Sequence, residues 1–251
     1  MIIDAGGYLG NFPYRKLYTN TPGSLSSYAS SLGITHMVVS SVDAVFYRDA
    51  SSGNDMLIDM LSEKTEVIFI PFCVVNPAYP GWEDDARKAV LTQGFKGFEL
   101  SPHYHRYKLN DENGLRAIGL AEKLNVPVRI TSGFEDLRQR SYMDVFEEPS
   151  SEELIDAARR FPSVKFLLIG HSSQNLAWCI DNNAYLDFSR LDVFEGVINT
   201  MKGLLFSPQK IIFATLAPFK YIEPQFVKLR HLDLDEGRRS EILYKNLNFL
   251  I

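Results

Sequence analysis

Glu99 and His171 are the side chains of this sequence best suited to move a proton at a reaction centre. Glu99 lies in the run GFEL and His171 directly follows VKFLLIG, and both runs are apolar enough to form buried strands. A carboxylate and an imidazole are common general acids and bases when they line a ligand cavity. We therefore take both residues as catalytic candidates, and a purely structural His171 stays an alternative.

Arg129 in VPVRITSG falls on the predicted strand next to that of Glu99. A charge within an apolar strand is tolerated only where it is paired or faces a polar cavity. In one interpretation the two residues form a salt bridge inside the protein. In the other, the guanidinium of Arg129 clamps a carboxylate or phosphate of a ligand by its bidentate fork.

His103 and His105 are two residues apart in SPHYHRY. In an extended segment both side chains would point to one side, where they could chelate a metal ion. We expect them instead to form a polar wall of a ligand pocket. Tyr8, Tyr104 and Tyr107 then suggest a pocket floor of aromatic rings that could stack on a flat ligand.

Motifs of several other enzyme classes are missing. The chain has no GxSxG elbow, no phosphate-binding loop and no GxGxxG turn. Ser101 or Ser132 can be combined with His171 and Asp187 into a Ser–His–Asp set. A fold that gathers many strand ends would offer such a set by chance, so we expect no triad.

Apolar runs typical of strands recur eight times along the chain and alternate with amphipathic helix patterns. The strand runs are MII, HMVVSS, VIFIPFCVV, GFKGFEL, VPVRITSG, VKFLLIGH, AYLDFSR and KIIFATLAPF. The helix patterns are DMLIDMLSE, WEDDARKAVLTQ, ENGLRAIGLAEKL, SEELIDAARRF, NLAWCIDN, FEGVINTMKGLL and EGRRSEILYKNLNFL. This alternation predicts a parallel sheet covered by helices. Eight units in a chain of this length predict one (β/α)8 TIM barrel over residues 1–251, with reactive residues at the carboxyl ends of its strands.

Composition and charge narrow the possible partners. The chain has 251 residues, 45% hydrophobic and 23% charged, which is typical of globular proteins. A net charge of −5 with scattered Lys and Arg argues against nucleic acid binding. Because no apolar run reaches membrane-spanning length and no secretion signal is visible, we expect a cytoplasmic protein without a membrane partner. Cys73 and Cys179 are then expected to be buried, reduced thiols.

Several segments resemble the amidohydrolase family 2 branch of the metal-dependent amidohydrolase superfamily, in the same order along nearly the whole chain. IIDAGGYLG resembles that family's IDAHxHxG strand, GFKGFELSPHYHRYKLND its GFKGxKLHP segment, and VPVRITSG its PVxxHTG. FPSVKFLLIGHSSQ resembles FPxVKFxxGH, NAYLDFSR resembles NxYxDxS, and KIIFATLAPF resembles RxxFGTDxPF. The resemblance implies an amidohydrolase-like TIM barrel.

The same resemblance implies metal ligands that this sequence largely lacks. Gly6 and Tyr8 stand where the family has the two histidines of its first strand, and Thr131 stands at the histidine of strand five. Leu216 replaces the aspartate of strand eight, and only the strand-six histidine is retained, as His171. A catalytic zinc site needs about three protein ligands. We therefore expect no metal, no other cofactor and no metal-assisted hydrolysis at this place.

Two functions remain in view. The first is a metal-free hydrolase, decarboxylase or lyase that binds a small polar or carboxylate ligand at the barrel mouth. The ligand-contacting candidates are Tyr8, His103, His105, Arg129 and Thr131. The alternative is a catalytically inactive barrel that serves as a ligand-binding or structural partner subunit. Residues 132–151 form a loop long enough to be a lid or a surface for a homodimer.

Overall fold

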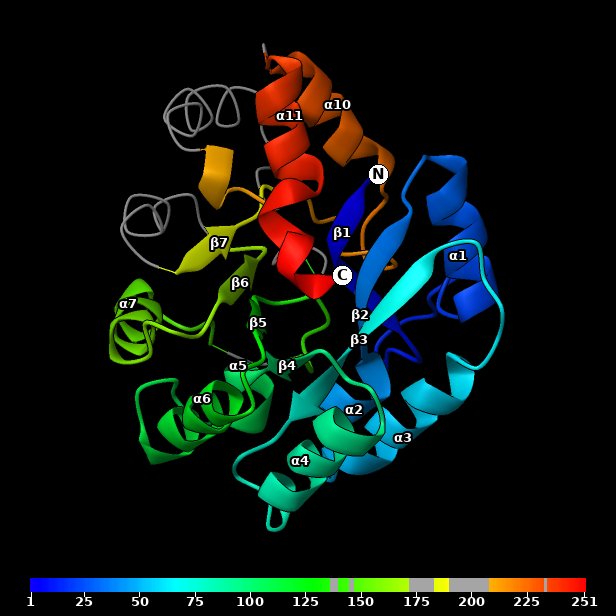
Figure 1. Cartoon of the computed structure of the whole chain (residues 1–251). Helices are drawn as coiled ribbons and strands as arrows, with labels where there is room; N and C mark the ends of the chain where they lie inside the picture. The colour runs from blue at the N-terminus through cyan, green and yellow to red at the C-terminus, as the bar shows by residue number, and fades with distance from the viewer. Residues whose placement is uncertain (136–139, 145–146, 172–182, 190–207, 233) are drawn as a thin grey trace.

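A computed structural model describes residues 1–135, 140–144, 147–171, 183–189, 208–232 and 234–251. One sheet contains seven parallel strands in sequence order, and each pairs with the next. These strands are β1 (Ile3–Leu9), β2 (His36–Ser41), β3 (Ile68–Val75), β4 (Gly97–Leu100), β5 (Val128–Thr131), β6 (Phe166–Ile169) and β7 (Ala184–Leu186). They fall on seven of the eight predicted runs, and the sheet curls as in a TIM-barrel-like α/β fold (Figure 1).

Helices lie around the outside of the curled sheet (Figure 1). The described helices are α1 (Pro22–Ser31), α2 (Val42–Phe46), α3 (Ala50–Met60), α4 (Trp82–Thr92), α5 (Pro102–His105), α6 (Glu112–Lys123), α7 (Ser151–Arg160), α10 (Glu223–His231) and α11 (Glu236–Leu243), with 3-10 turns η2 (Pro208–Lys210) and η3 (Lys245–Leu250). Side chains just before several helices satisfy their first amides. Asp111 accepts from the Gly114 amide and Ser150 from that of Glu153. Within the described part of the chain, every helix is too short or too polar to span a bilayer.

The predicted helices NLAWCIDN and FEGVINTMKGLL, with Cys179, lie outside the described residues. Cys73 is a buried free thiol, as predicted. His103 and His105 lie in the short helix α5, so the extended geometry that metal chelation by this pair would need is not present.

The eighth predicted strand, KIIFATLAPF, is not assigned as a strand. Ile211 forms an isolated bridge with Leu186 of β7, and the Ala5 amide of β1 donates to the Phe213 carbonyl at 2.9 Å. Two other amides of this segment donate to groups other than the backbone of a neighbouring strand. Phe213 donates its amide hydrogen to Ile242 of α11. The amide hydrogen of Thr215 goes to the side chain of Asp4.

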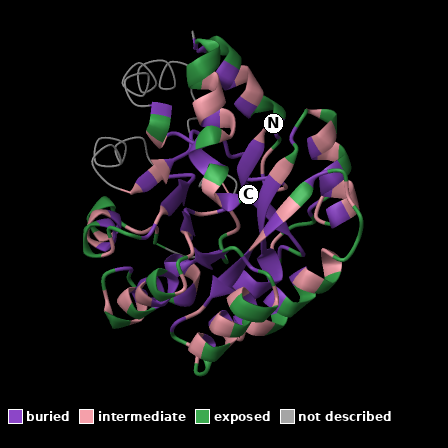
Figure 2. Cartoon of the chain, viewed as in Figure 1, coloured by how far each residue is buried: buried purple, intermediate pink, exposed green. Residues whose placement is uncertain are grey.

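Two apolar cores lie on the two sides of the sheet. Successive strand residues alternate between them, because neighbouring side chains on a strand point to opposite faces. In β3, Phe72 and Val74 belong to the inner core, whereas Cys73 and Val75 pack toward the helices. Figure 2 shows the sheet almost wholly buried beneath its partly exposed helices. Polar side chains that face inward are therefore held in a water-poor interior.

Candidate functional site

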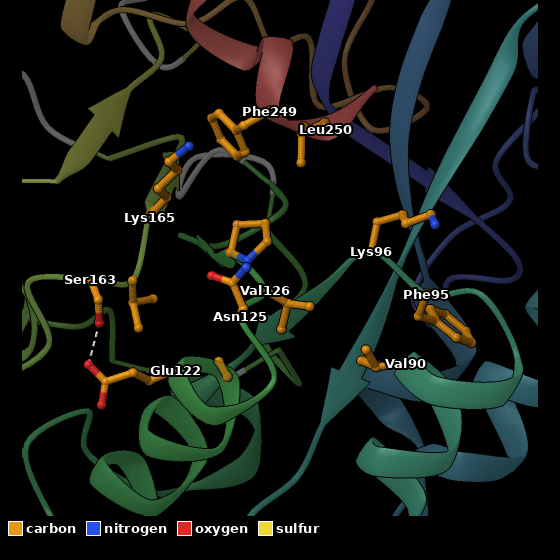
Figure 3. A pocket seen from close by; sticks show the side chains of 13 residues that line it. Val90, Phe95, Lys96, Glu122, Asn125, Val126, Ser163, Lys165, Phe249 and Leu250 are labelled. Carbon is orange, nitrogen blue, oxygen red and sulfur yellow. Dashed lines mark hydrogen bonds between the residues drawn. The ribbon is translucent and has the colours of Figure 1, made fainter.

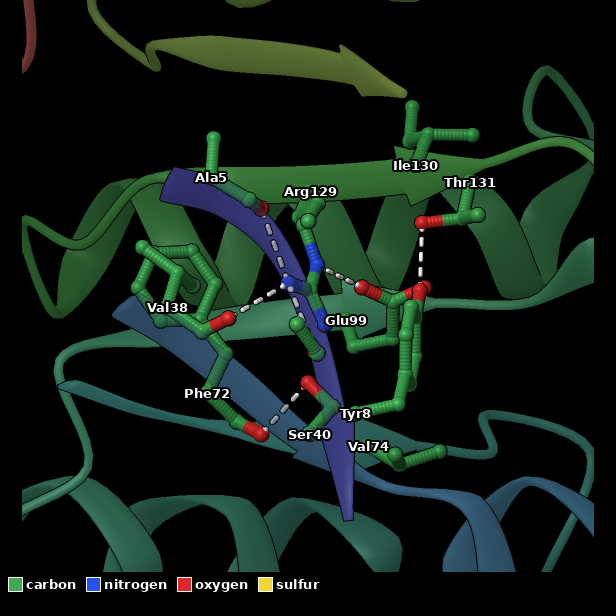
Figure 4. A network of polar contacts seen from close by, with 12 residues as sticks. Ala5, Tyr8, Val38, Ser40, Phe72, Val74, Glu99, Arg129, Ile130 and Thr131 are labelled. Carbon is green, nitrogen blue, oxygen red and sulfur yellow. Dashed lines mark hydrogen bonds and ion pairs between the residues drawn. The ribbon is translucent and has the colours of Figure 1, made fainter. Parts of the chain in front are cut away.

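Tyr8, Glu99, Arg129 and Thr131 meet inside the curled sheet, at the ends of β1, β4 and β5 (Figure 4). The Tyr8 hydroxyl lies 2.9 Å from Glu99 Oε1 and 2.5 Å from Thr131 Oγ1. Arg129 Nε forms an ion pair with Glu99 Oε2, so the predicted salt bridge is present. The side chains of Glu99 and Arg129 are both 0% exposed. Sequence-distant polar groups thus form one buried network.

Arg129 also binds the backbone where β1 is irregular. The pairing of β1 with β2 shifts register between Asp4 and Gly7. Arg129 Nη1 donates to the carbonyl oxygens of Ala5, Gly7 and Val38 at 2.9, 3.4 and 3.3 Å (Figure 4). A register shift leaves backbone acceptors without ladder partners, and buried acceptors need a donor. The guanidinium therefore holds β1 and β2 in place, and it stacks 4.6 Å from the centre of the Tyr8 ring.

Burial decides the charge states in this network. Burial raises the pKa of the Glu99 carboxyl, and the guanidinium of Arg129 opposes that shift. Burial raises the pKa of Tyr8 well above that of an ordinary phenol. Tyr8 is therefore a neutral phenol at physiological pH. A neutral phenol is a hydrogen-bond donor and a much poorer metal ligand than an imidazole or a carboxylate.

His171 is buried just after β6, with 4% of its surface exposed. Its Nε2 lies 3.0 Å from the carbonyl oxygen of Ile130 on β5. Because a carbonyl can only accept, Nε2 of His171 carries a hydrogen in this contact. His171 also lies close enough to His103 to contribute to lowering the pKa of His103.

His103 and His105 are both buried on α5. Burial lowers the pKa of His103 to about 3 and that of His105 to about 4, so both imidazoles are neutral at physiological pH. His105 Nε2 lies 3.0 Å from the carbonyl oxygen of Val45, after β2. Both side chains thus lie near the carboxyl ends of the strands, and His105 links α5 to α2.

Gly6 and Leu216 stand side by side at two of the positions where the resemblance implies metal ligands. A Cβ atom built on Gly6 would lie 3.1 Å from the Leu216 amide nitrogen and 3.1 Å from Ala214 Cβ. One built on Gly170 would lie 3.3 Å from Leu216 Cδ1. Leu216 has a φ of 59°, a left-handed conformation that is uncommon for a leucine. An isobutyl group thus fills space where the resemblance implies a carboxylate.

The donors at these positions do not fit a divalent metal ion. Glycine and leucine offer no side-chain donor, and the hydroxyls of Tyr8 and Thr131 bond each other. His171 alone supplies an imidazole, whereas a zinc site requires about three such ligands. Within the described residues, no group of three or more His, Cys, Asp or Glu side chains could hold an ion.

The Ser–His–Asp set is not hydrogen bonded as a triad among the described contacts. Ser132 donates its hydroxyl to the Gly170 carbonyl at 2.5 Å. Asp187 accepts from the amides of Gly170 and Ser189, each at 2.7 Å. The Asp187 carboxylate therefore orders the chain after β6 and β7.

Asp4 is a buried carboxylate near the start of β1. It accepts from the Gly6 amide at 2.9 Å, the Thr215 amide at 3.0 Å and the Thr215 hydroxyl at 2.5 Å. Burial raises its pKa to about 6, although these hydrogen bonds oppose the shift. Asp4 thus joins β1 to the segment that follows β7.

Aromatic rings from the loops after several strands pack together above the polar network. Phe134 and Phe219 stack with ring centres 4.4 Å apart, and Tyr8 meets Phe134 edge to face at 4.9 Å. Phe12 and Tyr104 join this cluster. The sequence suggested tyrosines at this place, but the three phenylalanines were missed. Phe134 directly follows the run VPVRITSG and Phe219 ends the run KIIFATLAPF, but nothing in either run indicates that the rings meet.

Comparisons with known proteins were made for the whole chain. A family model described as Amidohydrolase matches residues 7–184. No curated protein matches the sequence. Among solved structures, 5-carboxyvanillate decarboxylase from Sphingomonas paucimobilis is similar, with a TM-score of 0.75, 12% identity, and coverage of 99% of this chain and 98% of that one.

Two further structures have the same fold. Dihydroxybenzoic acid decarboxylase from Polaromonas sp., with bound manganese and 2-nitroresorcinol, gives a TM-score of 0.72 at 15% identity, covering 99% of this chain and 96% of that one. A probable 2-pyrone-4,6-dicarboxylic acid hydrolase from Acinetobacter baumannii, with citric acid bound, gives 0.69 at 14% identity, covering 99% and 98%.

Proposed function

Because the chain belongs to the amidohydrolase family, we propose that it binds a small polar or carboxylate ligand at the C-terminal mouth of its barrel without a divalent metal ion. The observation that carries this proposal is the hydrogen bond between Tyr8 and Thr131. These residues stand where the resemblance implies two histidine ligands. Neither residue has an imidazole or a carboxylate to offer a cation. Their hydroxyls are also hydrogen bonded to each other.

Decarboxylation and hydrolysis are the reaction classes to test. Decarboxylation leaves an electron pair on carbon that must take up a proton, whereas hydrolysis requires that water lose one. His171 and Glu99 are the groups that we assign to this proton transfer. We assign contact with the ligand to Tyr8, His103, His105, Arg129 and Thr131. The aromatic acids and the dicarboxylic acid in the names of the similar enzymes support a carboxylate as the ligand.

A second candidate function is a catalytically inactive barrel that binds a ligand or supports a partner subunit. The observation that favours it is the enclosure of Glu99 and Arg129, which are paired with each other and 0% exposed. Arg129 also donates to three backbone carbonyl groups. A charged pair that forms these hydrogen bonds holds the strands in position. Because it is also fully buried, a substrate cannot reach it without a change in the structure.

Protein without a purification tag is used to test the two candidate functions and the proposed absence of a metal ion. Elemental analysis is expected to find no stoichiometric zinc, manganese or iron, and about one bound equivalent would contradict the metal-free proposal. Turnover of lactones, amides or aromatic and β-keto acids is then measured with and without added Zn²⁺ or Mn²⁺. Turnover that survives chelation and collapses in His171→Ala, but persists in the control His36→Ala, supports the enzyme. If no compound of the panel is turned over, the result supports the inactive barrel.

We also propose that residues 211–217 take the place of the eighth strand and close the barrel. The alternation of Ile212 and Ala214 toward the inner core with Phe213 toward the outer core supports this closure. The amides of Ala5 and Tyr8 on β1 donate to Phe213 and Ala217 in this segment. Slow hydrogen exchange at those two amides is expected, and fast exchange would contradict closure.

A homodimer through residues 132–151 is a further proposal. Tyr142 and Met143 in this segment are 89% and 59% exposed, which is unusual for large apolar side chains. Light scattering after size-exclusion chromatography is expected to give twice the monomer mass for the native chain, and a lower mass for Tyr142→Ser. A native monomer would overturn the proposal.

A further inference from the structure

A cavity of about 380 Å³ (Figure 3) opens at the end of the sheet where β4, β5 and β6 begin, whereas the proposed mouth is at their carboxyl ends. Its walls come from the segments that precede β4, β5 and β6, which include Lys96, Pro127 and Lys165. The 3-10 turn η3 contributes Phe249 and Leu250 on another side. Ligand pockets in proteins run from about 300 to 1,000 Å³, so the cavity has the volume of a small-molecule site.

Apolar and polar surface both line the cavity, and eight of its thirteen described lining residues are apolar. Phe95 is 1% exposed and Leu250 is 9% exposed, so these side chains are fixed in the fold. Val90, Val126 and Phe249 add further aliphatic and aromatic surface. An apolar wall with a few polar groups is the usual construction of a small-molecule pocket, because the wall supplies affinity and the polar groups fix the orientation.

Two lysines supply the charge of this cavity. Lys96 and Lys165 line it from different loops (Figure 3), and neither forms an ion pair among the contacts of the described residues. Lys165 Nζ lies 3.8 Å from the centre of the Phe249 ring, and burial lowers the pKa of this lysine. An ammonium group that is partly withdrawn from water gains from a nearby anion.

Among the described lining residues, a single carboxylate is present, and it already has a hydrogen-bond partner. Glu122 of α6 accepts a hydrogen bond from the hydroxyl of Ser163 (Figure 3). The lining side chains therefore carry two positive charges against one negative charge. The charge balance favours an anion over a cation as the occupant.

We propose that this cavity is a second ligand site, separate from the mouth, that binds a small carboxylate with an aromatic or aliphatic body. The carboxylate pairs with the ammonium group of Lys165, and Lys96 on the opposite wall adds positive potential. The apolar body rests against Phe95, Val126 and Leu250. The site does not depend on the metal-free mouth, because its residues lie at the opposite ends of the strands.

The probe for this site is 1-naphthoate, with 1-naphthamide as the neutral control of the same shape. Calorimetric titration of the intact protein is expected to detect naphthoate binding that weakens as salt is added. Lys165→Gln is expected to weaken it about fivefold, because a partly exposed ion pair contributes about 1 kcal/mol, and Lys96→Gln is expected to weaken it less. Lys123→Gln, one residue after Glu122 and outside the lining, is the matched control and is expected to change nothing.

A second measurement does not depend on the variants. Amine acetylation read by mass spectrometry is expected to slow at Lys96 and Lys165 when naphthoate is present, and not at Lys123. Naphthoate binding that is unchanged in both lysine variants, with unprotected lysines, would place the ligand elsewhere and overturn the proposal. Equal affinity for naphthamide, or no binding of naphthoate at all, would overturn it as well.

Discussion

The phenol oxygen of Tyr8 on β1 lies 2.5 Å from the hydroxyl oxygen of Thr131 on β5. The same phenol is 2.9 Å from Glu99 on β4. Three strand ends are thus joined by direct side-chain hydrogen bonds in a space that water does not reach. This network therefore holds the ends of β1, β4 and β5 together.

Removing the Tyr8 hydroxyl tests how much this network stabilises the fold. Tyr8→Phe keeps the ring but leaves Glu99 and Thr131 each without one buried partner, which costs about 1–3 kcal/mol. Urea unfolding is expected to show that loss, against a change within about 0.5 kcal/mol for Tyr14→Phe. The hydroxyl of Tyr14 makes only a long 3.5 Å contact with the Met143 carbonyl. Equal effects of the two variants would mean that the Tyr8 network contributes nothing specific.

The pair of Glu99 and Arg129 is expected to behave as one unit. Arg129→Met leaves a buried carboxylate unpaired, and losing one partner of such a pair costs about 3–5 kcal/mol. Glu99→Leu combined with Arg129→Met removes both charges, so its cost is expected to be well below the sum of the single costs. A double-mutant cycle by urea unfolding measures this coupling. Additive effects would show that the two charges do not depend on each other.

The raised pKa of Asp4 predicts that the stability of the fold decreases as the pH rises. Burial raises its pKa from 3.8 to about 6, so between these values the folded chain holds more protons than the unfolded chain. The free energy of unfolding therefore falls as pH rises from about 4 to 6, and the contribution of Asp4 levels off above that range. A shift of this size is on the order of 3 kcal/mol.

The comparison of native protein with Asp4→Asn isolates this effect. Other buried carboxyl groups, such as Glu99 and Asp187, are present in both proteins and cancel in the difference. The variant is expected to gain stability relative to the native chain between pH 4 and pH 7, measured by urea unfolding at each pH. A difference that stays constant with pH would show that Asp4 does not titrate in this window.

The pattern of apolar runs predicted most of the sheet and the inward position of Glu99 and Arg129. Strands β1 to β7 fall on predicted runs because a parallel sheet that is buried on both faces leaves a continuous apolar signal. A charge inside such a run must be paired or face a polar cavity, and the salt bridge is the first of these two predicted arrangements. Local composition does not show where α3 begins. The polar stretch ASSGND forms its first turns, since Asp49 caps that helix and tertiary packing overrides the weak propensity of serine.

Contacts between distant parts of the chain could not be predicted. The bond from Asp4 to Thr215 spans 211 residues, and nothing in either local sequence indicates the other. The aromatic cluster of Phe12, Phe134 and Phe219 is assembled from three separate loops, whose packing depends on the curled arrangement of the strands. The short helices α2 and α5 contain too few turns to show a period.

Restoring the implied ligands tests the alignment of the strand ends with the family's metal site. A chain with Gly6→His, Tyr8→His, Thr131→His and Leu216→Asp would add four donors to the imidazole of His171. A Cβ atom on residue 6 would lie 3.1 Å from Ala214 Cβ, which is tight, so neighbours must move by a few tenths of an ångström to admit it. Equilibrium dialysis is expected to give about one Zn²⁺ per chain for this variant and none for the native chain, because the donor set then meets the requirement of a zinc site. Adding His171→Ala to the same variant is expected to weaken binding about tenfold or more. A folded fourfold variant that binds no Zn²⁺ would show that these positions do not converge as the structure places them.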